Sequence, residues 1–205
     1  MQDKDAIDKL IDEVLDGTEL RLVVDSYGLE ENLEPAHVHV ECRVHDERTG
    51  ATQVIDGDGV GLVDAVFHGM VARYAGEFPS LTTIRFADFS IKADVTSGGG
   101  ARSDMAAVAS LTIANSEGTE YIFSDASPSI TRSALASVLR GVEFFINSER
   151  AFIAVYRALN HAREANRPDS VARYTTQLTT LVQATSYSEV IEQIRKKELA
   201  GPKHG

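Results

Sequence analysis

The stretch from Asp56 to Tyr74, DGDGVGLVDAVFHGMVARY, constrains the fold of this chain more than any other. A β-branched segment, residues 51–55, runs into three glycines at alternate positions, and helical periodicity then follows from Val63 to Val71. The pattern predicts a strand, a glycine turn and a helix. Glycines can adopt positive φ and leave amide groups uncovered at a helix N-terminus, where a small anionic group can bind. A tight turn without a ligand explains the same residues, and the GxGxG spacing is not the dinucleotide-binding fingerprint.

Composition narrows the classes of partner. The chain has 205 residues, 43% of them hydrophobic, which suffices for one domain with a sizeable core and helical extensions. Its formal net charge of −11 argues against nucleic acid or an anionic membrane as a main partner, since both bind positive surfaces. The basic cluster Arg195–Lys197 is expected to complement the C-terminus of the last helix.

Cysteine usage and hydropathy set the expected compartment. Cys42 is the single cysteine, so the sequence predicts neither a disulfide framework nor a zinc cluster. The chain shows no signal-peptide pattern and no apolar run of membrane-spanning length. We therefore expect a cytoplasmic protein with no membrane partner.

The first half of the chain predicts a helix and three strands before the glycine turn. An amphipathic helix is expected over residues 3–16, a strand over 19–27 and a loop over 28–35. The segment His37–His45 alternates strictly, so its valines and Cys42 should face the core while its histidines face solvent. A turn at residues 46–50 leads into the short third strand, residues 51–55.

The second half repeats this plan. Strands are expected over residues 84–95, 105–114 and 120–124, with a flexible linker over 97–100 and a tight turn over 115–119. A helix follows, with Ser127 and Ser129 as candidate caps and Pro128 in its first turn. Placing Gly59 opposite Ala126 brings the two helices into phase. We predict an α+β fold with an internal duplication, βββα over 19–76 and βββα over 80–147, and added helices at 1–18 and 148–205.

Several segments together resemble one family. GVGLVDAVFHG, residues 59–69, looks like the GxGPVDA motif of the C-terminal regulatory domain of 2-isopropylmalate synthase and citramalate synthase. FSIKADVTSGGGARSDMAAVASLTI, residues 89–113, is similar to the strand, glycine-containing loop and alternating strand of that domain, and SDASPSITRSALASVL, residues 124–139, to its second turn and helix. The resemblance covers residues 19–147.

The resemblance implies a dimeric regulatory domain that binds a small amino acid, leucine or isoleucine, near the dimer interface between the two units. Such a ligand needs donors for its carboxylate, acceptors for its ammonium and an apolar pocket. Carried over by position, the ligand-binding residues would come from the first turn, the matching strand and the second turn: Gly59, Gly61, Leu62, Asp64, Ala65, Asp104, Ser127, Pro128 and Ile130. Amides of Gly61 and Leu62 could take the carboxylate, while Asp64 or Asp104 could face the ammonium.

The chain also departs from the family pattern. Leu62 stands where the family commonly has proline, and the second turn carries Asp125, Ser129 and Arg132 at positions that are usually glycine, asparagine and an acidic residue. The catalytic (β/α)₈ barrel of those synthases takes about 250 residues, for which this chain has no room. The resemblance therefore implies a stand-alone regulatory module, without enzymatic activity of its own, or one that serves a separate catalytic subunit.

Several residues also allow a metal site or an enzyme site. His37 and His39 share one strand face and, with Glu41 and His45, could bind a metal such as zinc, but a polar solvent-facing side of a sheet explains them better. Cys42 alternates with valines and is expected in the core, and no GxSxG elbow occurs. Asp56 and Asp58 lack the remaining acidic ligands of an EF-hand loop. We predict no catalytic residues, no metal and no cofactor.

The C-terminal segment predicts further helices. The helix of the second unit should continue from Ser148 to Asn166, Pro168 should break it, and helices should follow over 169–183 and 188–199. These helices could pack on the domain, or bind a partner or a second copy of the chain. Two functions stay open: a homodimeric amino-acid-binding regulatory module, and a structural or protein-interaction module of the same fold that has lost the ligand.

Overall fold

The computed structural model describes residues 4–93 and 106–199 and confirms the α+β fold with its duplicated βββα order. The first unit comprises β1 (Leu22–Leu33), β2 (Ala36–Asp46), β3 (Thr52–Gly59) and α2 (Leu62–Tyr74), preceded by α1 (Lys4–Leu15). A short 3₁₀ helix, η1 (Pro79–Thr83), leads to the second unit. That unit comprises β4 (Arg85–Ala93), β5 (Ala107–Ala114), β6 (Glu120–Ser127) and α3 (Ile130–Glu164), and the helices α4 (Pro168–Leu181) and α5 (Ser188–Leu199) follow.

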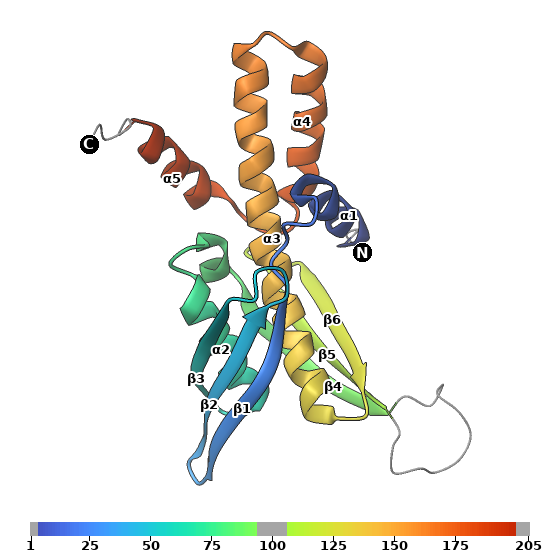
Figure 1. Cartoon of the computed structure of the whole chain (residues 1–205), viewed down its shortest axis with the longest axis vertical. Helices are drawn as coiled ribbons and strands as arrows, with labels where there is room; N and C mark the ends of the chain where they lie inside the picture. The colour runs from blue at the N-terminus through green and yellow to red at the C-terminus, as the bar shows by residue number, and fades with distance from the viewer. Residues whose placement is uncertain (1–3, 94–105, 200–205) are drawn as a thin grey trace.

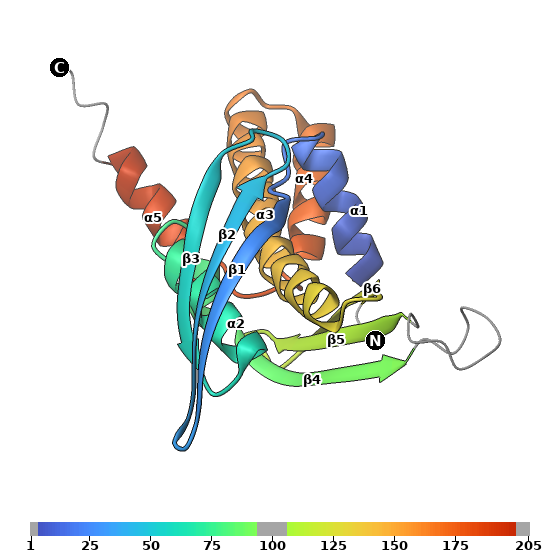
Figure 2. The same cartoon turned by 60° about the horizontal axis from the view of Figure 1, so that its bottom comes forward.

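Each unit contributes one antiparallel three-stranded sheet, in the orders β1-β2-β3 and β4-β5-β6. Helix α2 covers one face of the first sheet, and the N-terminal half of α3 runs between the two sheets (Figures 1 and 2). Helices α2 and α3 begin at Leu62 and Ile130, within one residue of the alignment that places Val63 opposite Ile130. The two units therefore share both the order and the phase of their elements.

Alternation along β2 sets the core face of the first sheet. Val38, Val40, Cys42 and Val44 are fully buried, as their alternation predicts, while the histidines between them face outward. Burial raises the pKa of the Cys42 thiol to about 11, which leaves it in the unreactive protonated form at neutral pH.

Strand β1 is longer than the sequence indicates. The prediction of a loop over residues 28–35 is wrong, because β1 continues to Leu33 and pairs with β2 as far as Leu33↔Ala36. Only Glu34 and Pro35, joined by a cis peptide bond, separate the two strands. Pairing with β2 satisfies the backbone groups of this polar segment, which outweighs its weak strand propensity.

The glycine turn also differs from the expectation. Gly57 and Gly59 lie inside β3, and Gly61 precedes α2 in an extended conformation, with φ −168°. None of the three has positive φ; among the described glycines only Gly17, Gly50 and Gly118 do. A Cβ on Gly57 would lie 2.1 Å from the backbone oxygen of Ala65, so glycine is required there by the close approach of α2 to the strand.

In the second unit, β6 runs to Ser127, three residues beyond the predicted strand, and Ser129 caps α3. The Ser129 hydroxyl accepts a hydrogen bond from the Arg132 amide (3.3 Å), while Pro128 precedes the cap instead of opening the helix. Helix α3 packs on the second sheet at Gly141, where a Cβ would lie 2.6 Å from Ile113. The predicted linker over residues 97–100 lies outside the described residues.

The C-terminal helices follow the predicted order. Helix α3 continues unbroken for 35 residues, and Pro168 occupies the first turn of α4, which returns along α3 beside α1 (Figure 1). Tyr187, just before α5, stacks on Phe152 of α3 with ring centroids 4.3 Å apart. Within the described ranges, no helix has the length and apolar character needed to cross a membrane.

Candidate functional site

A cleft of about 1030 Å³ lies between the edge strand β1 and the N-terminal half of α3. One wall comes from the first unit, through residues 21–27 of β1 and the segment before it, together with Glu47. The other wall comes from the second unit, through the end of β6 and the first turns of α3. The cleft is therefore built where the two units meet.

Side chains of α3 hold the edge of β1 in place. The Glu143 carboxylate accepts a hydrogen bond from the Leu22 amide. Farther along α3, the Asn147 side chain accepts from the Leu20 amide (2.8 Å) and donates to the Leu20 carbonyl (3.0 Å). An edge strand presents unpaired backbone groups, and these contacts replace the neighbouring strand that β1 lacks on this side.

Glu143 is the electrostatically unusual group of the cleft. Burial raises the pKa of its carboxyl to about 7, although the hydrogen bond from Leu22 and the nearby charge of Arg140 act in the opposite direction. Arg140 itself binds the Asp125 carboxylate (2.7 Å) and the Ser124 carbonyl (2.7 Å). A carboxyl that titrates near neutral pH in a cleft is a common mark of a functional site.

The cleft combines apolar and charged walls. The apolar residues that line the cleft include three buried leucines, Leu22, Leu135 and Leu139. The charged residues that line it include Asp25 and Arg132, which are exposed. A zwitterion with an apolar side chain needs this combination of an acidic group, a basic group and an apolar surface. The arrangement offers binding chemistry, and the described residues that line it show no hydrogen-bonded pair of nucleophile and general base.

The second predicted turn contributes to the cleft in part. Ser127 and Pro128 line it, and the Ser127 hydroxyl accepts a hydrogen bond from the Ser129 amide (3.1 Å). Ile130 is 53% exposed and does not line it.

The first predicted turn lies elsewhere. Gly59, Gly61, Leu62, Asp64 and Ala65 occupy the junction of β3 and α2, and none of them lines the cleft. The Asp64 carboxylate accepts a hydrogen bond from the Val60 amide (3.0 Å), so it organises this junction locally. The structure of one chain therefore does not bring the two turns into one cavity, and their joint site stays a prediction that involves a second copy. Asp104 lies outside the described residues.

Sequence reasoning missed the charged groups of the cleft. Glu143 and Arg140 adjoin the buried stripe of α3, where a charged residue beside Leu139 and Val142 is the signal that could have identified them. Asp25 belongs to a strand whose edge position is visible only once β1 is paired.

The histidine face of β2 lies open to solvent, as predicted. His45 Nδ1 lies 2.7 Å from Asp25 Oδ1, and His37 Nε2 lies 3.1 Å from Asp58 Oδ1. His39 faces both Asp56 and Asp58 of β3.

Comparison with known proteins adds no family assignment: no family model matches the chain, and no curated protein matches it.

Proposed function

We propose that this chain is a regulatory module that binds a small amino acid, such as leucine or isoleucine, in the cleft between its two units. The observation that carries the proposal is the cleft itself, which is lined by both units and combines apolar walls with acidic and basic groups. The resemblance to the regulatory domain of 2-isopropylmalate synthase, present in the segments quoted above, agrees with such a ligand.

In this proposal Arg140 binds the ligand carboxylate and Glu143 its ammonium, because the two groups of an α-amino acid share one carbon and these two residues lie one turn apart on α3. Both line the cleft, and Leu135 and Leu139, in the preceding turns of α3, offer an apolar surface for the ligand side chain. An ammonium group favours the ionised form of Glu143, whose carboxyl has a pKa of about 7. Ligand affinity should therefore rise as the pH increases through 7.

The module is proposed to act as a homodimer. Tyr27, Leu29 and Leu33 of β1 are 46%, 43% and 80% exposed, although they pair with Cys42, Val40 and Ala36 on the core face of the sheet. Apart from Glu31, which pairs with Val38, the apolar face of the first sheet thus continues past the helices that cover it, and a second copy would bury it. A ligand with different affinities for two arrangements of the copies would shift their populations.

The target of the regulation is proposed to be a separate polypeptide. The described residues form two three-stranded sheets and their helices, and no (β/α)₈ barrel is among them. A separate synthase subunit is the partner that the family resemblance suggests.

Thermal unfolding against leucine, isoleucine, valine and unrelated amino acids at millimolar concentration tests the proposal. A ligand at about one hundred times its dissociation constant stabilises the folded state by about 2.7 kcal/mol, which raises the midpoint by several degrees. Arg140→Ala should abolish the shift, whereas Arg157→Ala, an exposed arginine of α3 outside the cleft, should retain it.

A third variant, Gly61→Trp, examines the first turn. Loss of the shift in this variant would add the β3–α2 junction to the site, as the resemblance implies. Equal midpoints with every amino acid would contradict amino-acid sensing and favour the structural or protein-interaction module.

A further inference from the structure

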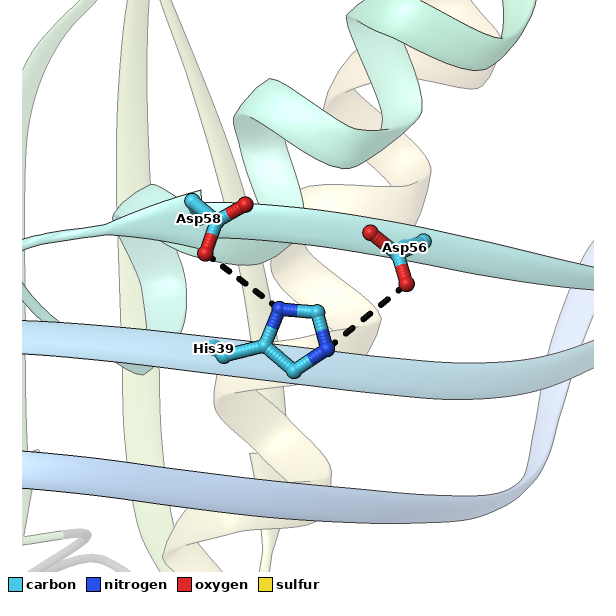
Figure 3. A group of neighbouring side chains, drawn as sticks. All are labelled: His39, Asp56 and Asp58. Atoms are coloured by element: carbon cyan, nitrogen blue, oxygen red, sulfur yellow. Dashed lines mark hydrogen bonds and ion pairs between the residues drawn. The ribbon is translucent and has the colours of Figure 1, made fainter.

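The outer face of the first sheet carries a second cluster of chemistry, away from the cleft. His39 of β2 stands between two aspartates of β3, with its Nδ1 3.3 Å from Asp58 Oδ1 and its Nε2 3.6 Å from Asp56 Oδ2 (Figure 3). One ligand atom from each of the three residues can be chosen so that all three lie within 4.8 Å of one another. His37 adds a contact of 3.1 Å between its Nε2 and Asp58 Oδ1.

We propose that His39, Asp56 and Asp58 form a binding site for a divalent transition-metal ion, with His37 orienting Asp58. One imidazole and two carboxylates are ligands that zinc and manganese accept. Three protein ligands leave the remaining coordination positions to water. The contact from His37 to a ligating carboxylate is the kind of outer contact that fixes ligand orientation in metal sites.

The strand register places the three ligands. His39 is the direct cross-strand partner of Asp58, and Asp56 lies two residues away on β3, on the same face of the sheet. Gly57 and Gly59 alternate with the aspartates and face α2, where a Cβ would collide with its backbone. Packing thus explains the glycines of the DGDG segment, whereas the side chains of the aspartates lie on the opposite face of the strand and are exposed.

The contacts of His39 favour a cation. A neutral imidazole has one N–H and one lone pair, so it can donate to only one of two carboxylates. One ring nitrogen therefore presents its lone pair toward an aspartate oxygen, and a proton or a metal ion bound at that nitrogen would make the contact attractive. The 3.6 Å separation on the Asp56 side is too long for a hydrogen bond.

An ion can bind only one ring nitrogen of His39, so the aspartate at the other nitrogen must rotate toward it, starting from three ligand atoms that lie within 4.8 Å of one another. Tetrahedral coordination with metal–ligand bonds of about 2.0–2.1 Å separates ligand atoms by about 3.3 Å. The side chains of His39, Asp56 and Asp58 are 38%, 65% and 62% exposed, so their rotamers can close on an ion without disturbing the core. Glu41, paired with Asp56 across the strands, adds negative charge nearby.

Isothermal titration calorimetry of the untagged full chain with Zn²⁺ and Mn²⁺ tests the site. We expect saturable binding of one ion per chain, and at least a tenfold loss of affinity in Asp56→Asn/Asp58→Asn. Asp25→Asn is the matched control: it removes a carboxylate that contacts His45 on the same sheet face, outside the three-residue cluster, and should keep the affinity of the unaltered chain. Circular dichroism of each variant verifies that it is folded.

Histidine NMR signals provide the second readout. The ring signals of His39 should shift on addition of Zn²⁺ while those of His45 stay in place, and His39→Gln identifies the signal. Absence of saturable binding with both ions would overturn the proposal. Equal affinity in the double aspartate variant would overturn it as well, because the ion would then bind elsewhere.

Discussion

Gly57→Ala adds a single methyl group at the closest approach of β3 and α2. Its Cβ would lie 2.1 Å from the Ala65 carbonyl oxygen and 2.9 Å from two backbone atoms of Gly69. All three atoms belong to the backbone of α2, so no rotamer change can relieve the contact, and the helix must withdraw by about 1 Å to restore van der Waals distance.

The energy follows from what that withdrawal disturbs. Helix α2 buries Val66, Phe67 and Met70 against the first sheet, and a gap of about 1 Å forfeits roughly half of the dispersion energy of the contacts it opens. Overpacking of this kind costs about 3 kcal/mol, and the reduced entropy of the unfolded chain offsets less than about 1 kcal/mol of that loss. A net cost of about 2–3 kcal/mol should lower the midpoint of thermal unfolding of a chain of this size by about 4–12 °C.

Gly61→Ala is the matched control. A Cβ there meets nothing within 4 Å, and the residue is extended, so its stability should stay within about 1 kcal/mol of the unaltered chain. Calorimetric or urea unfolding of both variants measures the difference. If Gly57→Ala were as stable as Gly61→Ala, the close approach of α2 to Gly57 would be refuted. If Gly61→Ala were the less stable variant, the result would support the positive-φ turn at Gly61 that the sequence predicted.

Three further perturbations have defined outcomes. Glu143→Gln keeps an acceptor for the Leu22 amide and removes a carboxyl whose pKa rises from 4.5 to about 7 on folding. The native carboxyl therefore destabilises the folded state least below pH 4.5 and progressively more between pH 4.5 and pH 7. Chemical unfolding should find the variant more stable than the unaltered chain by about 1–2 kcal/mol at pH 8, with little difference at pH 5. Asn147→Ala leaves both backbone groups of Leu20 without their partner and should lose about 1–3 kcal/mol in urea unfolding. Leu33→Asp should weaken the proposed dimer at least tenfold by sedimentation while leaving the unfolding of the monomer unchanged, and an unaltered association constant would remove β1 from the interface.

Local periodicity predicts most of the elements because it reports directly which face is buried. The strict alternation of β2 and the helical stripes of α1 and α3 need no knowledge of their partners, and each of these elements lies where its pattern indicates. The extension of β1 to Leu33 depends instead on pairing with β2, and its own residues, with Gly28 and several acidic side chains, are typical of a loop.

The DGDG segment shows a different limit. Glycine is compatible with a turn and with close helix packing, and only the position of α2 decides between them. A turn at Gly57, as the sequence predicted, would separate Asp56 from Asp58. The extended strand instead puts both side chains on one face beside His39. The grouping of His39, Asp56 and Asp58 could not be predicted until that strand was placed.

The cleft joins segments that are distant in sequence. Its walls come from residues near 21–27 and near 125–143, which carry no shared local pattern. Ser127 and Pro128 of the second turn line the cleft, whereas the residues of the first turn do not. Glu143 and Arg132 line the cleft because α3 passes beside β1, and local sequence does not reveal that packing.

Helix α3 is one continuous helix that connects the cleft with the helical end of the molecule formed with α4. Its 35 residues extend about 52 Å, from the cleft to the tip where it turns into α4. Glu164 lies about 31 Å beyond Glu143, so a tilt of about 5° around the cleft would displace that tip by about 3 Å. A small rotation of α3 at the cleft therefore produces a larger displacement at the helical end of the molecule, where a bound partner could respond to it.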